Sequence, residues 1–401
     1  MAGPADALRR GPLGNVTVVS IEQAVAAPFA TRQLADLGAR VIKIERPDGG
    51  DFARAYDTTV KGLSSYFVWL NRSKESLTLD LKRPQARSVL DRLLAKADVF
   101  VQNLGPGATD RLDLAAAALR AAHPRLIVCS VTGYGSTGPF ACRKAYDLLV
   151  QSEVGLLSIT GTEDHPSKAG ISIADIAAGM YAYSGILAAL LSRHATNEGT
   201  AIEVSLFDAL AEWMSAPAYY TAYGGAPPPR SGAHHASIAP YGVFLSRDGE
   251  HVYLAVQNPR EWTRFCGDVL RRPELADDER FRTNPARVRS RKLLHDEIDR
   301  VFATLAAGEI IQRLEAAGIA HARMNSIAAF LEHTQLTERK RWREIDSPAG
   351  ALRALVPPVL MEHTTPVMNA VPALGEHSEA ILEELGFDRR TVAAWRQEGA
   401  I

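Results

Sequence analysis

Asp175 is the carboxylate whose surroundings most need an explanation. It lies in the stretch Ile171–Met180, where the other residues are apolar or small, and a charge in such a setting is costly unless it has a role. One role is structural, because an N-cap or first-turn aspartate stabilises the start of a helix. The other is chemical, because a carboxylate in a dry pocket can attack a carbonyl or transfer a proton. The two roles are compatible, and the residues alone leave both open.

Four polar loops follow predicted strands in the N-terminal half of the chain. They are Val25–Pro28, Ile44–Pro47, Gln102–Gly107 and Thr132–Gly135. Open α/β sheets bind ligands at the carboxyl ends of their strands, so we expect these loops to lie together. Arg46 supplies a positive charge, Asn103 an amide and Tyr134 an aromatic ring, which suits an extended nucleotide-like ligand. The alternative is that Arg46 is a surface cation, Asn103 a turn former and the glycines ordinary turn residues.

Alternating strands and helices are needed to bring these loops to one edge of a sheet. From Val16 onward, short β-branched runs alternate with helical stretches. This pattern predicts an α/β fold with a mostly parallel, Rossmann-like sheet that helices cover on both faces. The expected strands are 16–19, 40–44, 77–81, 99–101 and 126–131, and the expected helices are 28–37, 84–96, 112–122 and 175–193.

The composition changes near Gly224, which predicts a domain boundary. The Pro- and Gly-rich stretch 224–232 cannot form a regular helix or a central strand and is interpreted as a linker. A hairpin is expected after it, with strands 242–245 and 251–256 around a turn at Asp248-Gly249. We therefore expect a large α/β domain over 1–223, a linker and smaller α+β domain over 224–330, and a C-terminal segment over 331–401 that returns to the large domain.

Composition and missing motifs exclude several classes of function. The 401 residues carry a formal net charge of −1, so no basic surplus indicates a nucleic-acid or membrane partner. The sequence has no Gly-x-x-x-x-Gly-Lys, no Gly-x-Gly-x-x-Gly after the first strand, no His-Glu-x-x-His and no Gly-x-Ser-x-Gly. This argues against an NTPase, a simple dinucleotide oxidoreductase, a zinc peptidase and an α/β-hydrolase.

Histidines and cysteines give no metal site or disulfide framework. His234-His235 lies in the linker region, just after the Pro- and Gly-rich stretch, and is interpreted as a solvated loop. Cys129, Cys142 and Cys266 are too few and too widely spaced for a disulfide scaffold. We expect a cytoplasmic protein, since no secretory signal and no membrane span is recognisable either.

Taken in order, these loops and Asp175 resemble the class III CoA-transferases, the family that includes formyl-CoA transferase and carnitine CoA-transferase. The resemblance covers nearly the whole chain. It is carried by Ala26–Pro28, Leu34–Ala39, Val41–Pro47, Asn103–Ala108, Ser130–Gly135, Ala174-Asp175, Leu374–Ser378, Glu384–Phe387 and Gly399–Ile401. The segment Glu22–Phe29 looks most like the branch that handles mesaconyl-CoA and related C4 dicarboxylates.

The resemblance implies roles for individual residues. Asp175 is implied as the acyl-accepting nucleophile. Contacts with CoA are implied for Val25 and Ala26, for Arg46 at the nucleotide end, for Leu79 and Tyr134 along the ligand, and for Asn103 and Arg111 near the phosphates or pantetheine. The CoA thioester is a substrate, and no permanently bound cofactor or metal is implied. The implied assembly is a homodimer of two interlocked, ring-shaped subunits.

Two departures from formyl-CoA transferase bear on the substrate. Val25 replaces a glutamine that works beside the catalytic aspartate there, and the glycine-rich flap has no equivalent around Pro240–Gly242. Chemistry on a formate-sized acyl group is therefore not expected.

Two other functions would fit the same loops. An α-methylacyl-CoA racemase shares the implied fold but moves a proton with a His and Asp pair, and Tyr146 stands where that histidine would fall. Tyrosine with its ordinary pKa near 10 is a poor proton shuttle at pH 7, so a transferase is favoured. A non-catalytic acyl-CoA-binding protein would keep the loops without requiring Asp175.

The expected reaction moves CoA from an acyl-CoA to a carboxylic acid through an acyl-aspartyl anhydride and an aspartyl-CoA thioester. Backbone N–H groups at the start of the Asp175 helix are expected to stabilise the oxyanions. Small dicarboxylates such as succinate, mesaconate, itaconate or malate are the expected acids, and transfer within one molecule is a further option. The reason is a set of nearby cations, although these could equally be solvated surface: Arg32, Arg54, Arg72, Lys144 and Lys168.

Overall fold

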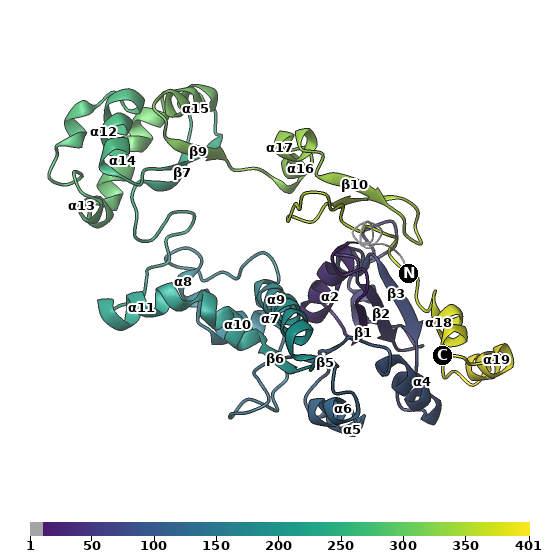
Figure 1. Ribbon diagram of the computed structural model, residues 1–401. Coiled ribbons are helices and arrows are strands. Elements are labelled where there is room, and N and C mark those ends of the chain that lie inside the picture. Colours follow the sequence, from purple (N-terminus) through teal and green to yellow (C-terminus); the bar gives the residue numbers. More distant parts are fainter. Residues whose placement is uncertain (1–10) are drawn as a thin grey trace. The chain divides into compact units, whose positions relative to one another are not determined.

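The computed structural model describes residues 11–401, which form two compact units (Figure 1). The first unit comprises the described chain up to Val154 together with Gly170–Met214 and Leu336–Ile401. The second comprises Gly155–Ala169 and Ser215–Gln335. The boundary that the sequence placed after residue 223 therefore falls inside the second unit, because helix α11 (Ser215–Gly224) belongs to that unit.

A six-stranded, fully parallel sheet forms the centre of the first unit. Its strand order is β3-β2-β1-β4-β5-β6. The bounds are β1 (Thr17–Ile21), β2 (Arg40–Glu45), β3 (Lys74–Thr78), β4 (Val99–Gln102), β5 (Ile127–Thr132) and β6 (Ala201–Ser205). The expected α/β fold is confirmed, and β6 is an additional strand that the sequence pattern did not predict.

The third strand begins three residues earlier than the pattern predicted. Lys74 and Ser76 belong to β3 and are buried, because Lys74 is ion-paired with Glu22 and Ser76 is hydrogen-bonded to Glu45. A polar strand segment with buried partners has no hydrophobic pattern, so the sequence predicted this strand only from Leu77 onward.

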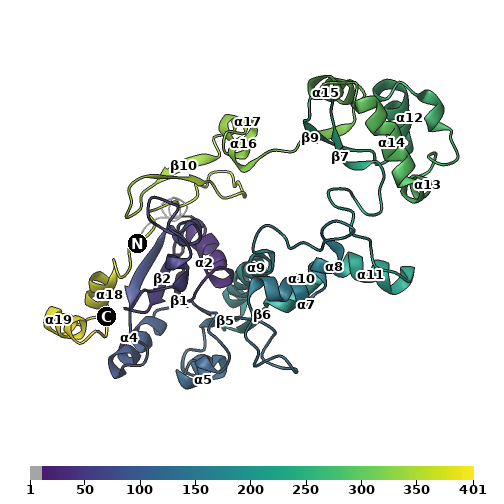
Figure 2. The ribbon, with the colours of Figure 1, turned by 180° about the vertical axis from the view of Figure 1, so that it is seen from behind.

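Helices cover both faces of the sheet. The main apolar core joins one face to α4 (Pro84–Leu94), α6 (Ala116–Ala122), α18 (Ser378–Glu384) and α19 (Arg389–Gln397). On the other face α2 (Ala26–Asp36) packs against β2, and α9 (Ile173–Thr196) packs against β5 and β6. Helices α2 and α9 lie side by side (Figure 2).

Shorter helices and one turn complete the first unit. Asp113 has a φ of 52°, which interrupts the helix expected over 112–122 and leaves α5 (Ala108–Arg111) separate from α6. The remaining helices are the 3₁₀ turn η1 (Phe52–Ala55), α3 (Ser65–Asn71), α7 (Asp147–Glu153) and α10 (Leu206–Trp213).

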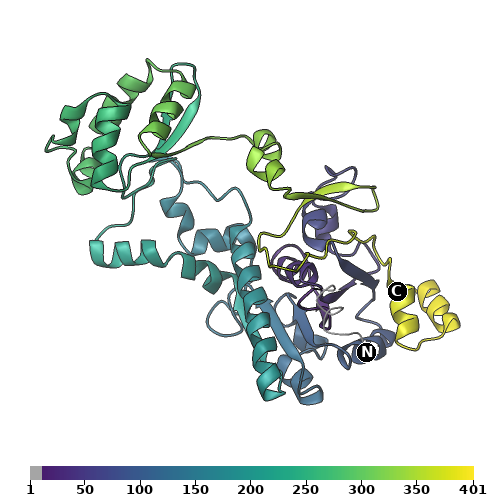
Figure 3. The ribbon, with the colours of Figure 1, turned by 45° about the horizontal axis from the view of Figure 1, so that its top comes forward.

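The C-terminal segment packs against strand β3 of the first unit. The backbone N–H of Thr78 donates to the Ser378 hydroxyl at 3.0 Å, and the N–H of Asp80 donates to the Ala400 carbonyl at 2.8 Å. Figure 3 shows α18 and α19 together beside the sheet. The same segment contains the hairpin β10 (Trp342–Ile345) and β11 (Leu352–Leu355). Residues distant in sequence thus support the ends of the central strands.

The second unit is an α+β body with its own core. Strands β7 (Tyr241–Leu245), β8 (His251–Ala255) and β9 (Ala320–Arg323) form an antiparallel sheet, and the β7–β8 hairpin is the one expected from the sequence. Its helical segments are α8 (Leu156–Ile159), α11, α12 (Pro259–Arg264), η2 (Phe265–Val269), η3 (Pro273–Ala276), α13 (Asn284–Arg289), α14 (Arg291–Phe302), α15 (Ala307–Ala316) and α16 (Ile327–Leu331). Helix α17 (Thr334–Glu338) spans the change from the second unit to the first.

By length and composition alone, helix α9 is long and apolar enough to cross a membrane. A core helix of a folded domain has the same properties, and α9 contacts α2, α10 and two strands of the sheet. Its apolar character is explained by that packing.

Candidate active site

Asp175 lies in the first turn of α9, as the third residue of the helix. It is not the N-cap, which is Ser172, and the Ser172 side chain makes no capping hydrogen bond. The cap comes from α7: the Oδ1 atom of Asp147 accepts from the N–H of Ala174 at 2.7 Å and from the N–H of Asp175 at 3.3 Å. Of the two structural roles considered for Asp175, the first-turn role is confirmed and the N-cap role is wrong.

Burial and a neighbouring charge make the Asp175 carboxyl unusual. Burial raises its pKa, and the negative charge of Asp147 raises it further, to about 7. Within residues 11–401 no group donates a hydrogen bond to the Asp175 carboxylate oxygens. An unpaired carboxylate with a raised pKa is more basic than an ordinary aspartate and is only partly ionised near pH 7. Such perturbed groups are typical of catalytic positions.

The backbone amides that the sequence suggested as oxyanion donors are already used. The N–H groups of Ala174 and Asp175 donate to Asp147. The N–H of Ile173 donates to the Ile171 carbonyl at 2.9 Å, and that of Ile176 donates to the Ser172 carbonyl at 2.9 Å. The expectation that the start of α9 provides an oxyanion hole is therefore wrong for this structure, because its N–H groups have internal acceptors.

The turn between β1 and α2 holds Val25 and Ala26 in a defined backbone conformation. Ala24 has a φ of 62°, and its N–H donates to Oδ1 of Asp51 at 3.0 Å. Asn103 makes a reciprocal pair with Gln23: its Oδ1 accepts from the Gln23 N–H, and its Nδ2 donates to the Gln23 carbonyl, both at 2.8 Å. The side chain of Asn103 thus fixes this turn from the end of β4.

A close helix contact brings this turn next to the helix of Asp175. Gly179 lies one turn after Asp175, and a Cβ at that position would come within 2.7 Å of the Ala26 carbonyl oxygen. Only a glycine lets α2 and α9 approach so closely. Val25 and Ala26 are therefore positioned by the same contact that positions α9.

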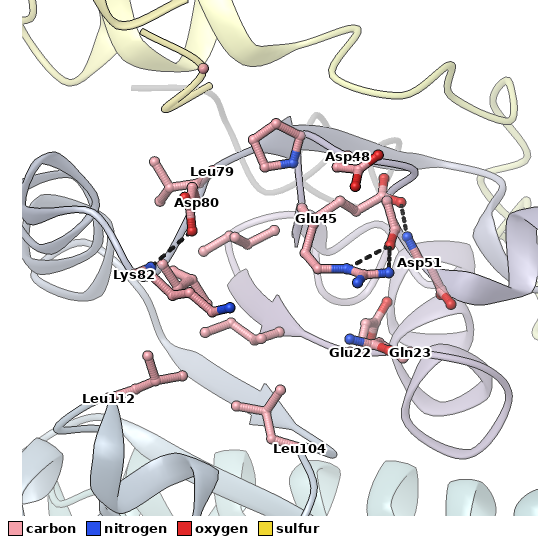
Figure 4. Close-up of a pocket in the computed structure, with 17 residues that line it drawn as sticks. Glu22, Gln23, Glu45, Asp48, Asp51, Leu79, Asp80, Lys82, Leu104 and Leu112 are labelled. Carbon is pink, nitrogen blue, oxygen red and sulfur yellow. Dashed lines mark hydrogen bonds between the residues drawn. The ribbon is translucent and has the colours of Figure 1, made fainter.

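A pocket of about 450 Å³ lies at the carboxyl ends of β1, β2 and β3 (Figure 4). Leu79, Leu104 and Leu112 give it an apolar side, and Arg46 and Lys82 give it cationic groups. The Arg46 guanidinium is held by the Gly50 carbonyl, to which Nη2 donates at 3.1 Å. An apolar wall next to the held guanidinium of Arg46 is a suitable site for the nucleotide part of a ligand.

The predicted site residues fall into separate groups in the structure. Arg46 and Leu79 line the pocket, whereas Asp175, Val25, Ala26, Asn103, Arg111 and Tyr134 do not. Arg111 is exposed at the end of α5. Tyr134 follows β5 and packs edge-on against Phe140, with ring centroids 5.4 Å apart.

A buried ionic cluster supports these loops, and sequence reasoning missed it. Lys43 is ion-paired with Asp51 at 2.7 Å, and Lys74 is ion-paired with Glu22 at 2.7 Å, with all four side chains inaccessible to solvent. Lys43 also lies 3.6 Å from Glu22. Because Asp51 binds Lys43 through Oδ2 and the Ala24 backbone through Oδ1, this cluster anchors the β1–α2 turn.

The structure corrects the role expected for three of the five cations. Arg32 and Arg72 both bind the Asp36 carboxylate, at 2.7 and 2.8 Å, and all three side chains are buried. Arg54 binds Glu45 at 2.8 Å. These guanidinium groups are engaged in internal ion pairs and are not available to a substrate. Lys144 is exposed on the loop before α7, and Lys168 belongs to the second unit.

Two tyrosines, Tyr146 and Tyr56, bear on the candidate site. Tyr146, at the position where a racemase would have histidine, directly precedes α7 and is 63% exposed. The pKa of Tyr56 is raised to about 12 by burial first, and then by the negative charges of Asp51 and Asp175. Tyr56 was not identified from the sequence, since nothing in its local sequence distinguishes it from other tyrosines.

Within the described part of the chain, no group of three or more His, Cys, Asp or Glu side chains is arranged to hold a metal ion. The three cysteines are unpaired.

Comparison with known proteins shows which family the sequence is similar to. The sequence profile of CoA-transferase family III matches residues 13–378. A succinate–glutarate CoA-transferase from Agrobacterium fabrum is 34% identical over 96% of this chain and 98% of its own length. Succinyl-CoA:glutarate CoA-transferase from Mus musculus is 33% identical over 97% of this chain and 90% of its own length.

A third relative and a solved structure agree with these matches. Succinyl-CoA:mesaconate CoA-transferase from Haloarcula hispanica is 30% identical over 95% of this chain and 98% of its own length. The crystal structure of a CAIB/BAIF family protein from Brucella suis is 33% identical, has a TM-score of 0.82, and covers 94% of this chain and 99% of that one. The resemblance seen in the sequence is thereby confirmed, and the chain belongs to CoA-transferase family III.

Proposed function

We propose that this protein transfers CoA from an acyl-CoA to a small dicarboxylic acid, with Asp175 as the nucleophile. The observation that carries the proposal is the state of Asp175: a half-buried carboxylate without a hydrogen-bond donor, at the start of a helix, with its pKa raised to about 7. Structural carboxylates in this protein, such as Asp36 and Glu22, are paired with cations. Asp175 alone among these three is left free to react.

The proposed reaction balances without any further reactant. A carboxylate oxygen of Asp175 attacks the thioester carbonyl carbon, the C–S bond breaks, and CoA leaves as a thiolate with an acyl-aspartyl anhydride formed. The thiolate attacks the aspartyl carbonyl, which releases the donor acid and gives an aspartyl-CoA thioester. The acceptor carboxylate then attacks this thioester, releasing the thiolate and forming a second anhydride. Attack of the thiolate on the acceptor's carbonyl yields the new acyl-CoA and restores Asp175.

The nucleotide end of CoA is placed in the pocket at the ends of β1–β3. Its leucines suit a flat base, and Arg46 and Lys82 suit phosphate groups. Arg111, exposed on α5, is kept as a further phosphate contact. Val25 and Ala26 belong to the turn next to α9 and are placed near the thioester end.

Dicarboxylates are proposed because three relatives that align over nearly their whole length are named for succinyl-CoA, glutarate or mesaconate. Of the five cations expected near the site, Arg32, Arg54 and Arg72 are internally paired and Lys168 belongs to the second unit, which leaves Lys144. Lys144 is exposed three residues before Asp147 and is the proposed partner of the second carboxylate.

A screen of donors and acceptors tests this function. Purified protein is incubated with succinyl-CoA, mesaconyl-CoA or acetyl-CoA and a panel of mono- and dicarboxylates, and the new thioesters are identified by mass spectrometry. We expect succinyl-CoA with a C4 or C5 dicarboxylate to be the best pair, and Asp175→Ala to be inactive. A wide preference for acetate or carnitine would contradict the dicarboxylate assignment.

The proposed assembly is an interlocked homodimer in the cytoplasm. Large side chains are exposed in both units, including Leu191 at 75% on α9 and Tyr223 at 85% on α11. Large side chains that gather on one exposed face, as Tyr219, Tyr220 and Tyr223 do on α11, are typical of surfaces that another protein covers. Interlocked subunits cannot separate without opening, so native mass spectrometry at nanomolar concentration should show dimer only. A rapid monomer–dimer equilibrium would contradict the interlocked arrangement.

A further inference from the structure

The helix that carries the proposed nucleophile is capped from another helix: the carboxylate of Asp147 on α7 accepts hydrogen bonds at the start of α9, where the N-cap residue Ser172 makes none. Asp147 Oδ1 accepts from both Ala174 and Asp175, across 27 and 28 residues of sequence. Its other oxygen, Oδ2, accepts from Nε2 of Gln151 at 2.6 Å. Both oxygens of Asp147 are therefore fixed, and its charge is held next to Asp175.

We propose that Asp147 is a positioning residue for CoA transfer: its oxygens orient the turn that carries Asp175, and its charge adds to the effect of burial on the pH dependence of transfer. The inference rests on the proposed role of Asp175. Asp147 itself contacts only backbone N–H groups and Gln151 in the structure, so it takes no part in bond making.

Two properties of the Asp147 side chain, its acceptor oxygens and its negative charge, explain why an aspartate occupies this position. An asparagine or serine would supply an acceptor oxygen for the two N–H groups, and both are common helix caps. Only a carboxylate also makes the neighbouring carboxylate harder to ionise. A more basic Asp175 is a stronger nucleophile once ionised, which favours attack on a thioester.

Other charged groups on the elements packed against α9 are engaged elsewhere or distant from its first turn. On α2, Arg32 and Asp36 are paired with each other, and on β6 Glu203 accepts a hydrogen bond from the Ser136 N–H. On α10, Asp208 is hydrogen-bonded to Ser205, and Glu212 is exposed. Glu153 on α7 is exposed, and β5 carries no charged residue. Tyr56, whose pKa is raised to about 12, is uncharged at neutral pH. Burial is the main cause of the raised pKa of Asp175, and the negative charge of Asp147 adds to it.

The experiment compares pH profiles of kcat/KM for the full chain and three variants between pH 5 and 9. Asp147→Asn keeps an acceptor oxygen and removes the charge, while Asp147→Ala removes both. Glu198→Gln is the matched control, since it removes one exposed negative charge beyond the other end of α9, roughly 35 Å away for a helix of 24 residues.

We expect kcat/KM of the wild type to decrease as the pH is lowered past about 7, because Asp175 becomes protonated in that range. Asp147→Asn should shift this acid limb toward lower pH by roughly one unit and keep kcat within about 3-fold at pH 8.5. Asp147→Ala should shift the limb likewise and lower kcat at pH 8.5 by more than 10-fold, since the turn loses its cap. Glu198→Gln should match the wild type.

An acid limb of Asp147→Asn that overlays the wild type would overturn the proposal, and so would full activity of Asp147→Ala. If Asp147→Asn does not fold, as judged by circular dichroism, Asp147→Ser provides the uncharged acceptor instead. Asp175→Ala is measured alongside: activity in that variant contradicts the proposed nucleophile, whereas an unshifted Asp147→Asn with an inactive Asp175→Ala contradicts only the role of Asp147.

Discussion

Gly179 on α9 faces the carbonyl oxygen of Ala26 on α2 so closely that a Cβ would lie 2.7 Å from that oxygen and 2.9 Å from the Phe29 ring. The first of these contacts is with backbone, so it cannot be relieved by rotating a side chain. The distance between the Asp175 helix and the β1–α2 turn is therefore set by the absence of one methyl group.

Gly179→Ala is expected to push α2 and α9 apart and to lower kcat by roughly 100-fold, because a shift of about 1 Å misplaces the reacting groups. Gly185→Ala is the matched control on the same helix, since its Cβ would meet Ile202 at an ordinary 3.4 Å. That control should keep its activity and be as stable as the wild type or slightly more stable. Equal activities of the two variants would show that the close approach has no catalytic importance.

Asp175→Asn is expected to stabilise the protein at neutral and alkaline pH. The folded-state pKa of Asp175 is about 7, above the ordinary 3.8, so folding favours its protonated form and ionisation costs stability as pH rises above 3.8. The difference of roughly 3 pKa units corresponds to at most about 4 kcal/mol. Urea unfolding at pH 4 and pH 8 should show a gain at pH 8 that largely disappears at pH 4. A variant that is less stable than the wild type at pH 8 would contradict the raised pKa.

Local sequence was sufficient to single out Asp175 as an unusual acid and to predict the parallel sheet, whereas the nucleophilic role of Asp175 was implied only by the family resemblance. A lone acid among small and apolar residues is visible within ten positions, and β-branched runs are visible within five. The cap from Asp147 and the clamp from Asn103 have no such signature, since they join residues 27 and 80 positions apart. Arg72 and Asp36 are likewise 36 positions apart, whereas Arg32 and Asp36 have the i,i+4 spacing of a helical ion pair, a local signal that could have been recognised.

Asp36→Asn is expected to lower the free energy of unfolding by about 3–5 kcal/mol, because it leaves Arg32 and Arg72 buried without their shared anion. The control is Asp91→Asn, which breaks an exposed pair with Arg87 and should cost less than about 1 kcal/mol. Neither variant should change the preference among dicarboxylates. A changed KM for succinate in Arg72→Met, without loss of stability, would return Arg72 to the substrate site.

Arg46→Ala is expected to raise the KM for every acyl-CoA donor by roughly 10- to 100-fold, because a charge-assisted phosphate contact contributes about 1.5–3 kcal/mol. The maximal rate should fall less, since the pocket that Arg46 lines is not lined by Asp175. Arg87→Ala, which removes an exposed cation from α4, should leave the KM unchanged. Isothermal titration with free CoA gives the same comparison without turnover, and equal affinities of Arg46→Ala and wild type would exclude Arg46 from the CoA site.

The proposed function requires that Asp175 becomes covalently bonded during transfer. The direct measurement is mass spectrometry of the enzyme quenched with hydroxylamine after mixing with succinyl-CoA, followed by peptide mapping. We predict a hydroxamate on the peptide that contains Asp175, formed only when the acyl-CoA is present and missing in Asp175→Asn. Full transfer activity in Asp175→Asn, or a hydroxamate on another carboxylate, would contradict the account.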